Sequence, residues 1–294
     1  MSPHPAPGAG TLRILLAGAF DYSGLFPPAQ LELPAVLANY RSYRTSADAW
    51  ALGRLVVPAT RLTELEGLLG ESGRPEHSVL PVSAVVGADP AGDVRRIERF
   101  NRGTPRHGAS VECVETKGEW ASIPAEWVRY VEVPLGAGNA AALDAIAQAG
   151  AFAKIRTGGL TQEAFPPPEA LIAFLAAAAE RRLSFKATAG LHHPLRGSYR
   201  LTYAENPPRG MMYGYLNLLL AAAVLWIGAG SARARQALLE QDPAAIRSDA
   251  HGLVWRDLRL ERATLATLRS DFLHGFGSCS FREPMDELVA GGWE

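Results

Sequence analysis

Two short segments each place a lysine in the middle of a strand-like run. FAKIRTGG (residues 152–159) contains Lys154, and SFKATAGLHH (residues 184–193) contains Lys186. An unpaired ammonium group is costly inside a sheet, so each lysine either has a partner or takes part in chemistry. The chemistry that uses two neighbouring lysines is Schiff-base formation, in which one neutral amine attacks a carbonyl carbon and a nearby ammonium lowers its pKa.

Alternation along each strand indicates where these side chains point. In the first segment, Ala153 and Ile155 suit a face that is covered by helices, and this turns Lys154 and Arg156 to the opposite face. In the second segment, the same reasoning turns Lys186 away from its apolar neighbours. If the strands belong to a closed sheet, these three basic residues meet inside it.

Glutamates on two earlier strand-like runs are expected in the same interior. Glu132 alternates with valines in RYVEVPLG (residues 129–136), so it faces inward. In ASVECVET (residues 109–116), either Glu112 or Glu115 faces inward, depending on the register. These carboxylates either neutralise the lysines as ion pairs or move protons for them, and both interpretations remain open.

The elements that must position these residues alternate along the chain. Strand-like runs are followed by amphipathic stretches, a pattern typical of a parallel sheet. The predicted strands are 12–20, 53–59, 80–87, 109–116, 129–136, 152–159, 184–190 and 271–281, with helices at 33–50, 60–70, 91–102, 124–127, 139–150 and 167–182. Eight strands predict a (β/α)8 TIM barrel. An open doubly wound sheet is the alternative, but no Gly-rich phosphate loop follows the first strand.

The domain organisation follows from the same pattern. Residues 1–11 form a Pro/Gly/Ala-rich tail that we expect to be disordered, and residues 12–294 form a single barrel domain. A helical insertion at about 195–269 separates strands seven and eight, with helices expected near 215–227, 232–240 and 260–270. This insertion could act as a lid or as a contact in a homo-oligomer.

Composition excludes several classes of function. The formal net charge is −1 and the basic residues are scattered, which argues against a nucleic-acid partner. The apolar run at 214–230 is interrupted by Asn217 and glycines, so we predict a buried helix and no membrane span. Two cysteines without CxxC spacing and the absence of a signal peptide predict a cytoplasmic protein.

AKIRTGG and FKATAG resemble the two lysine motifs of deoxyribose-phosphate aldolase and its class I aldolase relatives, and FGSCSF (residues 276–281) is similar to the family's last-strand run. The resemblance covers about a third of the chain. It implies a lyase in which Lys154 forms the imine and Lys186 tunes it, with a strand-four glutamate in place of the family's aspartate. It implies a small anionic carbonyl substrate, no cofactor, and anion donors drawn from Gly158, Gly159, Gly190, Gly277 and Ser278. Arg156 departs from the family pattern and predicts a carboxylate or phosphate on the substrate.

Two other functions remain open. His192 and His193 follow strand seven, and with Asp21 and His274 they could hold a divalent metal in a metal-dependent barrel enzyme. We favour a histidine acting as acid, base or anion donor, and place Asp21 at the rim after strand one. The second alternative is a barrel that binds a small ligand without turnover.

The C-terminal segment contains a second candidate nucleophile, Cys279. The sequence places no histidine so as to activate it, and we therefore predict a buried, unreactive thiol. The following FREP segment (residues 281–284) is predicted to begin the last helix.

Overall fold

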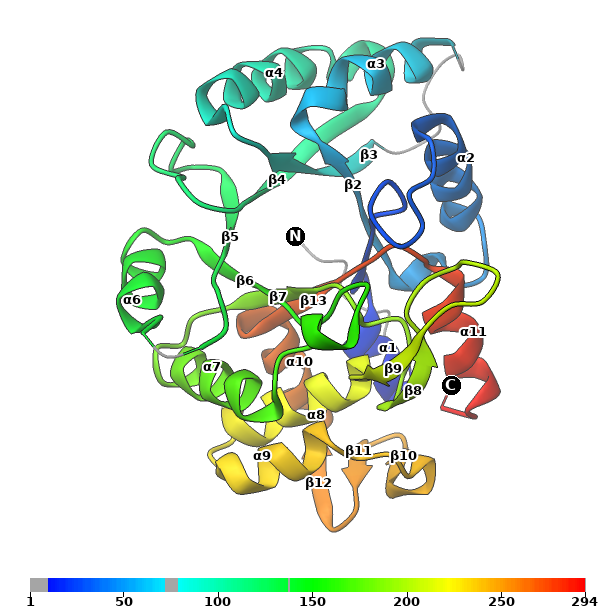
Figure 1. Ribbon diagram of the computed structural model, residues 1–294, viewed down its shortest axis with the longest axis vertical. Coiled ribbons are helices and arrows are strands. Elements are labelled where there is room, and N and C mark those ends of the chain that lie inside the picture. Colours follow the sequence, from blue (N-terminus) through cyan, green and yellow to red (C-terminus); the bar gives the residue numbers. More distant parts are fainter. Residues whose placement is uncertain (1–9, 72–78, 137, 294) are drawn as a thin grey trace.

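Eight parallel strands close into a barrel in the computed structural model, which describes residues 10–71, 79–136 and 138–293 (Figure 1). Each strand pairs with the next along the chain, and the first pairs with the last. The barrel strands are β1 (Phe20–Tyr22), β2 (Leu52–Pro58), β3 (Leu80–Val86), β4 (Ala109–Thr116), β5 (Val128–Glu132), β6 (Phe152–Arg156), β7 (Phe185–Thr188) and β13 (Leu273–Ser278). The predicted TIM-type barrel is therefore confirmed.

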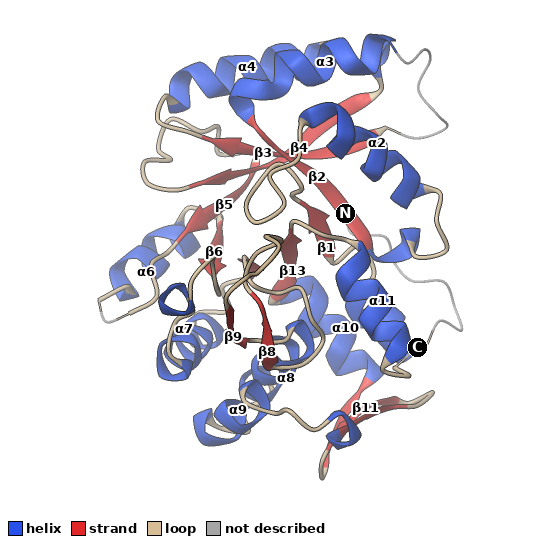
Figure 2. Ribbon diagram, turned by 45° about the vertical axis from the view of Figure 1, so that its right-hand side comes forward, coloured by secondary structure: helices blue, strands red, loops and turns tan. Residues whose placement is uncertain are grey.

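Helices surround the barrel on its outside (Figure 2). They are α2 (Leu33–Arg44), α3 (Leu62–Glu71), α4 (Pro90–Arg102), α6 (Ala140–Gln148), α7 (Pro168–Glu180), α8 (Tyr215–Trp226) and α11 (Arg282–Ala290). Apart from α8, which is buried on all sides, they present an apolar stripe to the sheet. In α7, for example, Leu171, Leu175 and Ala178 lie on one face and are fully buried.

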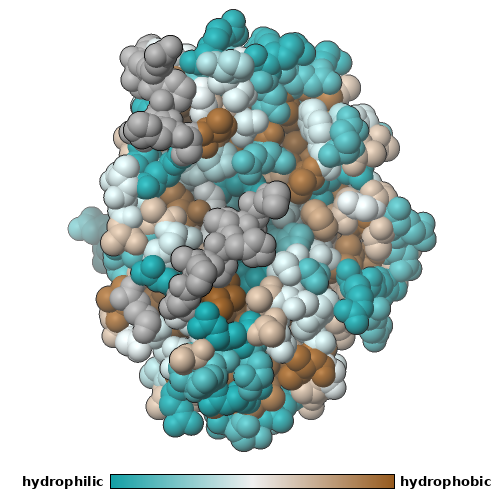
Figure 3. Space-filling view, turned by 180° about the vertical axis from the view of Figure 1, so that it is seen from behind, coloured by the Kyte–Doolittle hydropathy of each residue, from teal (hydrophilic) through white to brown (hydrophobic). Residues whose placement is uncertain are grey.

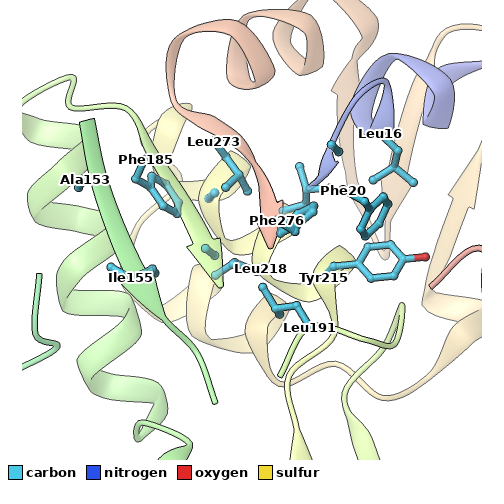
Figure 4. Packing of buried hydrophobic residues seen from close by; sticks show 14 of the residues in the cluster. Leu16, Phe20, Ala153, Ile155, Phe185, Leu191, Tyr215, Leu218, Leu273 and Phe276 are labelled. Carbon is cyan, nitrogen blue, oxygen red and sulfur yellow. The ribbon is translucent and has the colours of Figure 1, made fainter. Parts of the chain in front are cut away.

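The core between strands and helices accounts for the direction of the lysines. Ala153 and Ile155 of β6 and Phe185 of β7 are fully buried among aliphatic and aromatic side chains (Figure 4). Farther round the barrel, Phe20 of β1 packs edge-on against Tyr215 of α8 with ring centroids 5.1 Å apart. Alternate residues of a strand face opposite sides. Because Ala153 and Ile155 pack outside the barrel, Lys154 between them points inward, as predicted.

The first predicted strand is wrong in its extent. Residues 12–20 do not form one strand, because α1 (Thr11–Leu16) is a helix and only Phe20–Tyr22 enters the barrel. Leu12, Leu15 and Leu16 are buried, which is the i, i+3, i+4 spacing of a helix, and a short apolar run does not distinguish this from a strand. Of the predicted disordered tail, residues 1–9 lie outside the described residues, whereas Thr11 donates a hydrogen bond to the Asp249 carbonyl.

The connection between β4 and β5 also differs from the prediction. No helix forms at Pro124–Trp127 in this fully described segment, where the Trp127 amide instead closes a turn on the Pro124 carbonyl. A single proline-initiated turn has too few residues to form successive helical hydrogen bonds. One crossover of the barrel therefore lacks its helix, while the short α5 (Thr104–His107) supplements α4 before β4.

The insertion contains strands that were not predicted. β8 (Gly197–Arg200) and β9 (Arg209–Met212) form an antiparallel hairpin, and β10 (Ile246–Ser248), β11 (Gly252–Trp255) and β12 (Leu258–Glu261) form a three-stranded sheet. The helices α9 (Ser231–Leu238) and α10 (Arg262–Asp271) are close to the predicted ones. Strands of three or four residues are too short to show alternation, and this is why periodicity missed them. Figures 1 and 2 place the small sheet at the end of the molecule opposite α3 and α4.

The apolar run that resembled a membrane span forms α8, a buried 12-residue helix of the barrel layer. Among the described helices, none combines the length and apolar character needed to cross a bilayer. On the face shown in Figure 3, hydrophobic residues form small separate groups among hydrophilic ones. The predicted homo-oligomer stays a prediction.

Candidate active site

A row of three charged residues crosses adjacent strands inside the barrel. Glu132 of β5 is the register partner of Lys154 of β6, and Lys154 is the register partner of Lys186 of β7. Lys154 Nζ lies 3.0 Å from Glu132 Oε2. The predicted inward orientation of these three side chains agrees with their burial and contacts.

The Glu115 carboxylate joins the two lysines. Lys186 Nζ donates to its Oε1 atom at 2.7 Å, and Lys154 Nζ lies 3.4 Å from its Oε2 atom. The Ser83 hydroxyl of β3 also donates to Oε1, at 2.9 Å. Both oxygens of one buried carboxylate are thus used, one on each lysine.

A β-bulge decides which strand-four glutamate takes this position. Val82 pairs with Val111 whereas Ser83 pairs with Cys113, so Glu112 is an extra residue in β4. Its side chain is 46% exposed and forms an ion pair with Arg54 at 3.2 Å. Glu112, kept as an alternative catalytic residue, therefore does not contact either lysine, and Glu115 does.

Asp21 lies deeper than predicted. It is a buried residue of β1, and its Oδ2 atom accepts a hydrogen bond from Lys186 Nζ at 2.5 Å. Its Oδ1 atom accepts the Arg54 backbone N–H at 2.6 Å. The rim position expected for Asp21 was wrong because the strand begins at Phe20, which brings Asp21 into the barrel interior.

These contacts set the charge states of the cluster. Burial raises the pKa of Glu115, but the charges of Lys186 and Lys154 and the hydrogen bonds from Lys186 and Ser83 lower it to about 2. Burial lowers the pKa of Lys186, but the carboxylates of Asp21 and Glu115 raise it above that of a free lysine. Lys186 also lies over the Tyr130 ring, 5.3 Å from its centroid. Lys186 is therefore a permanent ammonium and Glu115 a permanent carboxylate near neutral pH.

A cavity of about 440 Å³ opens above this cluster, at the carboxyl ends of the barrel strands. Glu115, Glu132 and Lys154 are among its lining residues, whereas Lys186, which is 2% exposed, is not. Arg200 and Tyr203 of the β8–β9 hairpin segment line it from the insertion side. Of these two buried lysines, Lys154 is thus the one that a small molecule in the cavity can reach.

The predicted anion-binding glycines divide into two groups. Gly159, Gly190 and Gly277 line the cavity. Gly158 is a packing residue, because a Cβ atom there would lie 2.5 Å from the Phe165 ring. Ser278 is also not free to bind a substrate anion, since its hydroxyl donates to the Ser280 carbonyl at 2.6 Å.

Three cationic residues surround the mouth of the cavity: Lys117, Arg156 and Arg200. Arg156 was expected inside with Lys154, but it is the exposed last residue of β6, where the barrel opens. Within the described residues, no hydrogen bond or ion pair engages any of these three side chains. Their positive charge is available to an anionic ligand.

The histidines do not converge on a metal. Asp21 pairs with Lys186. His274 lies near the start of β13, and its Nδ1 atom is 3.0 Å from the hydroxyl of Tyr130. His192 and His193 each contact a glutamate of α11, Glu283 and Glu287. In the part of the chain that the structure describes, no three His, Cys, Asp or Glu side chains are grouped as metal ligands would be. The metal site considered from the sequence is therefore not assembled by these residues.

No protein-family model and no curated protein sequence matches this chain.

One compositional signal points directly to this cavity. The chain contains 3 lysines against 26 arginines. Two of the three, Lys117 and Lys154, line the cavity, and the third, Lys186, is joined to Lys154 through Glu115. Arginine cannot provide a neutral nucleophile, whereas a lysine amine can.

Sequence reasoning missed residues that come from distant segments. Ser83 orients Glu115, and Glu283, in the segment predicted only to start the last helix, contacts His192. Cys279 is buried as predicted, but the structure brings to it a histidine that the sequence did not place there, with His192 Nε2 3.8 Å from its Sγ. No local pattern reports such contacts, because they depend on which strands pair in the barrel: β3 with β4 for Ser83 and Glu115, and β7 with β13 for His192 and Cys279.

Proposed function

We propose that this protein is a class I aldolase-like lyase that forms a Schiff base between Lys154 and a small anionic carbonyl compound. The observation that carries the proposal is the gathering of all three lysines of an arginine-rich chain at one cavity, where only Lys154 of the buried pair is accessible. The lyase assignment draws on the resemblance of the two lysine motifs to aldolases. It is supported by their positions on the sixth and seventh strands of the barrel.

Glu132 is the base in the proposed reaction. At 3.0 Å it can take a proton from the Lys154 ammonium, which leaves a neutral amine to attack the carbonyl carbon. The C–N bond forms, a proton moves from nitrogen to the carbonyl oxygen, and the resulting hydroxyl leaves as water with the proton returned by Glu132. The sum is ammonium plus carbonyl giving iminium plus water.

The surrounding charges are compatible with this exchange. The Lys154 ammonium and the iminium carry the same charge, so the carboxylates of Glu132 and Glu115 stabilise both. The iminium then withdraws electrons from the neighbouring α-carbon of the substrate. This weakens the bond between the α-carbon and the β-carbon. Lys186, held by Asp21 and Glu115, acts as a positioning residue that fixes Glu115.

An anionic substrate is favoured by the mouth of the cavity. Lys117, Arg156 and Arg200 face it, while the floor carries the paired cluster. Guanidinium groups bind carboxylate or phosphate through parallel hydrogen bonds. The volume of about 440 Å³ suits a small molecule.

Reductive trapping tests the proposal. The protein is incubated with small aldehydes and ketones that carry a carboxylate or phosphate, reduced with borohydride, and digested for mass spectrometry. We expect a stable adduct on Lys154 and little on Lys117, which serves as an exposed internal reference. Lys154→Arg keeps the positive charge and should abolish the adduct. An adduct confined to Lys117 or the terminal amine, or unchanged labelling of Lys154→Arg, would contradict the proposal.

A further inference from the structure

The thiol of Cys279 also lines the cavity. Its Sγ atom lies 3.8 Å from His192 Nε2, and His192 Nδ1 lies 3.1 Å from Glu283 Oε2. The Tyr203 hydroxyl donates to the same Glu283 oxygen at 2.6 Å. All four residues line the cavity that contains Lys154. This order of thiol, imidazole and carboxylate is the arrangement that activates a cysteine nucleophile.

The fold holds these groups rigidly. His192 follows β7 and Cys279 follows β13, and these two strands are neighbours in the barrel. Glu283 lies in the first turn of α11, and its backbone N–H donates to the Ser280 hydroxyl. Because both His192 ring nitrogens have partners and the residue is 6% exposed, the ring has one orientation.

The electrostatics support a charged pair. Burial lowers the pKa of His192, but its contacts with Cys279 and Glu283 raise it to about 10. Burial raises the pKa of Glu283, but the hydrogen bonds from His192 and Tyr203 outweigh this effect, so the pKa of Glu283 is lowered overall.

We propose that Cys279 is a nucleophile that adds to the carbonyl carbon of a small anionic compound, with His192 as its proton carrier and Glu283 and Tyr203 as positioning residues. The choice of an anionic carbonyl compound rests on the proposed function, but the reactivity of the thiol does not require Lys154. In the addition, the Sγ–C bond forms and the π electrons of the carbonyl move to its oxygen. That oxygen takes the proton from the His192 imidazolium, and an aldehyde yields a thiohemiacetal without an oxidant or a leaving group.

Other titratable groups surround this pair. Tyr22 of β1 interacts electrostatically with Cys279, and His193 interacts with Glu283. His193 is itself held by Glu287 at 2.8 Å and stacks on Tyr199. The pH profile of the thiol therefore reports His192 and Glu283 together with these neighbours.

Alkylation kinetics test the inference, and the chain provides its own reference. Cys113 is buried in the barrel, with its pKa raised to about 11 by burial. Rates for both cysteines are measured by mass spectrometry with iodoacetamide and iodoacetate from pH 5 to pH 9. We expect Cys279 to react well below the ordinary thiol pKa of about 8.5, to prefer the anionic reagent, and to exceed Cys113 by at least ~100-fold.

Matched variants separate activation from simple exposure. His192→Gln should slow the alkylation of Cys279 at pH 6 by at least ~10-fold, whereas His251→Gln, the same change at an exposed histidine, should leave the rate unchanged. An ordinary thiol profile, equal rates in both variants, or a Cys279 that reacts only after unfolding would overturn the inference.

A protection experiment distinguishes this inference from the Schiff-base proposal. Glyoxylate, a small anionic aldehyde, should protect Cys279 from alkylation in the unmodified protein and in Lys154→Arg alike. If glyoxylate protects Cys279 in the unmodified protein but reduction traps no adduct on Lys154, the result supports Cys279 as a nucleophile and contradicts only the Schiff-base proposal. Loss of protection in Lys154→Arg shows that the thiol does not bind the aldehyde by itself, which contradicts the inference.

Discussion

Lys154 and Lys186 lie directly opposite each other on neighbouring barrel strands, yet they have different surroundings. Lys186 is enclosed by Asp21 and Glu115, while Lys154 contacts Glu132 and faces the cavity. Glu115 connects them with one carboxylate oxygen each. The pair therefore combines a fixed ammonium with an accessible one, and this asymmetry makes Lys154 the nucleophile in our proposal.

Removal of the Glu115 charge should destabilise the protein strongly. Glu115→Gln leaves two buried ammonium groups short of a partner, and such a loss costs ~3–5 kcal/mol in the free energy of unfolding. Glu112→Gln, three residues earlier in the same strand, breaks only a partly exposed pair and should cost ~0–1 kcal/mol. Urea unfolding of both variants measures the difference. Equal losses would show that Glu115 is not the central counter-ion.

Acid should weaken the fold through the same residue. The folded-state pKa of Glu115 is about 2, and its ordinary value is 4.5. The stabilisation of the fold by the charged carboxylate is therefore complete above pH 4.5 and is lost as the pH falls toward 2. At ~1.4 kcal/mol per pKa unit, the contribution should fall by roughly 2 kcal/mol between pH 6 and pH 3. The destabilisation caused by Glu115→Gln should therefore be smaller at pH 3. Parallel stability curves for the two proteins would argue against this linkage.

Glu132→Gln should separate chemistry from stability. The amide keeps the shape of the side chain but cannot accept the Lys154 proton, so the rate of reductive trapping should fall by ~10²–10⁴-fold. The adduct that does form should remain on Lys154. Glu126→Gln, an exposed change just before β5, is the control and should trap at the normal rate. If Glu132→Gln also trapped normally, another group would have to take the proton.

Arg156→Gln should affect recognition of the substrate charge. Loss of about 1.4 kcal/mol of binding corresponds to a tenfold higher half-saturating concentration of an anionic aldehyde. A neutral aldehyde should be unaffected, and the free energy of unfolding should change by less than ~0.5 kcal/mol, because Arg156 is exposed at the strand end. Arg247→Gln, at an exposed position on β10, is the matched control. An equal loss with both aldehydes would indicate a general change in the cavity instead.

Several features of this protein follow from the sequence alone. Strand and helix runs alternate along the chain, which indicates a parallel sheet covered by helices, and the count of eight strands favours a closed barrel over an open sheet. Alternation within those strands correctly turned Glu132, Lys154 and Lys186 inward, since side chains of a strand repeat with a period of two.

Only the tertiary structure decided the features that break these periods or cross the barrel. The bulge at Glu112 shifts the register of β4 and brings Glu115 to the lysines, and the late start of β1 places Asp21 beside Lys186. Cys279 and His192 meet although 87 residues separate them, because β13 pairs with β7 across the long insertion. Local periodicity determines which face of a strand a residue occupies, whereas its partners across the cavity depend on how the strands are registered and closed.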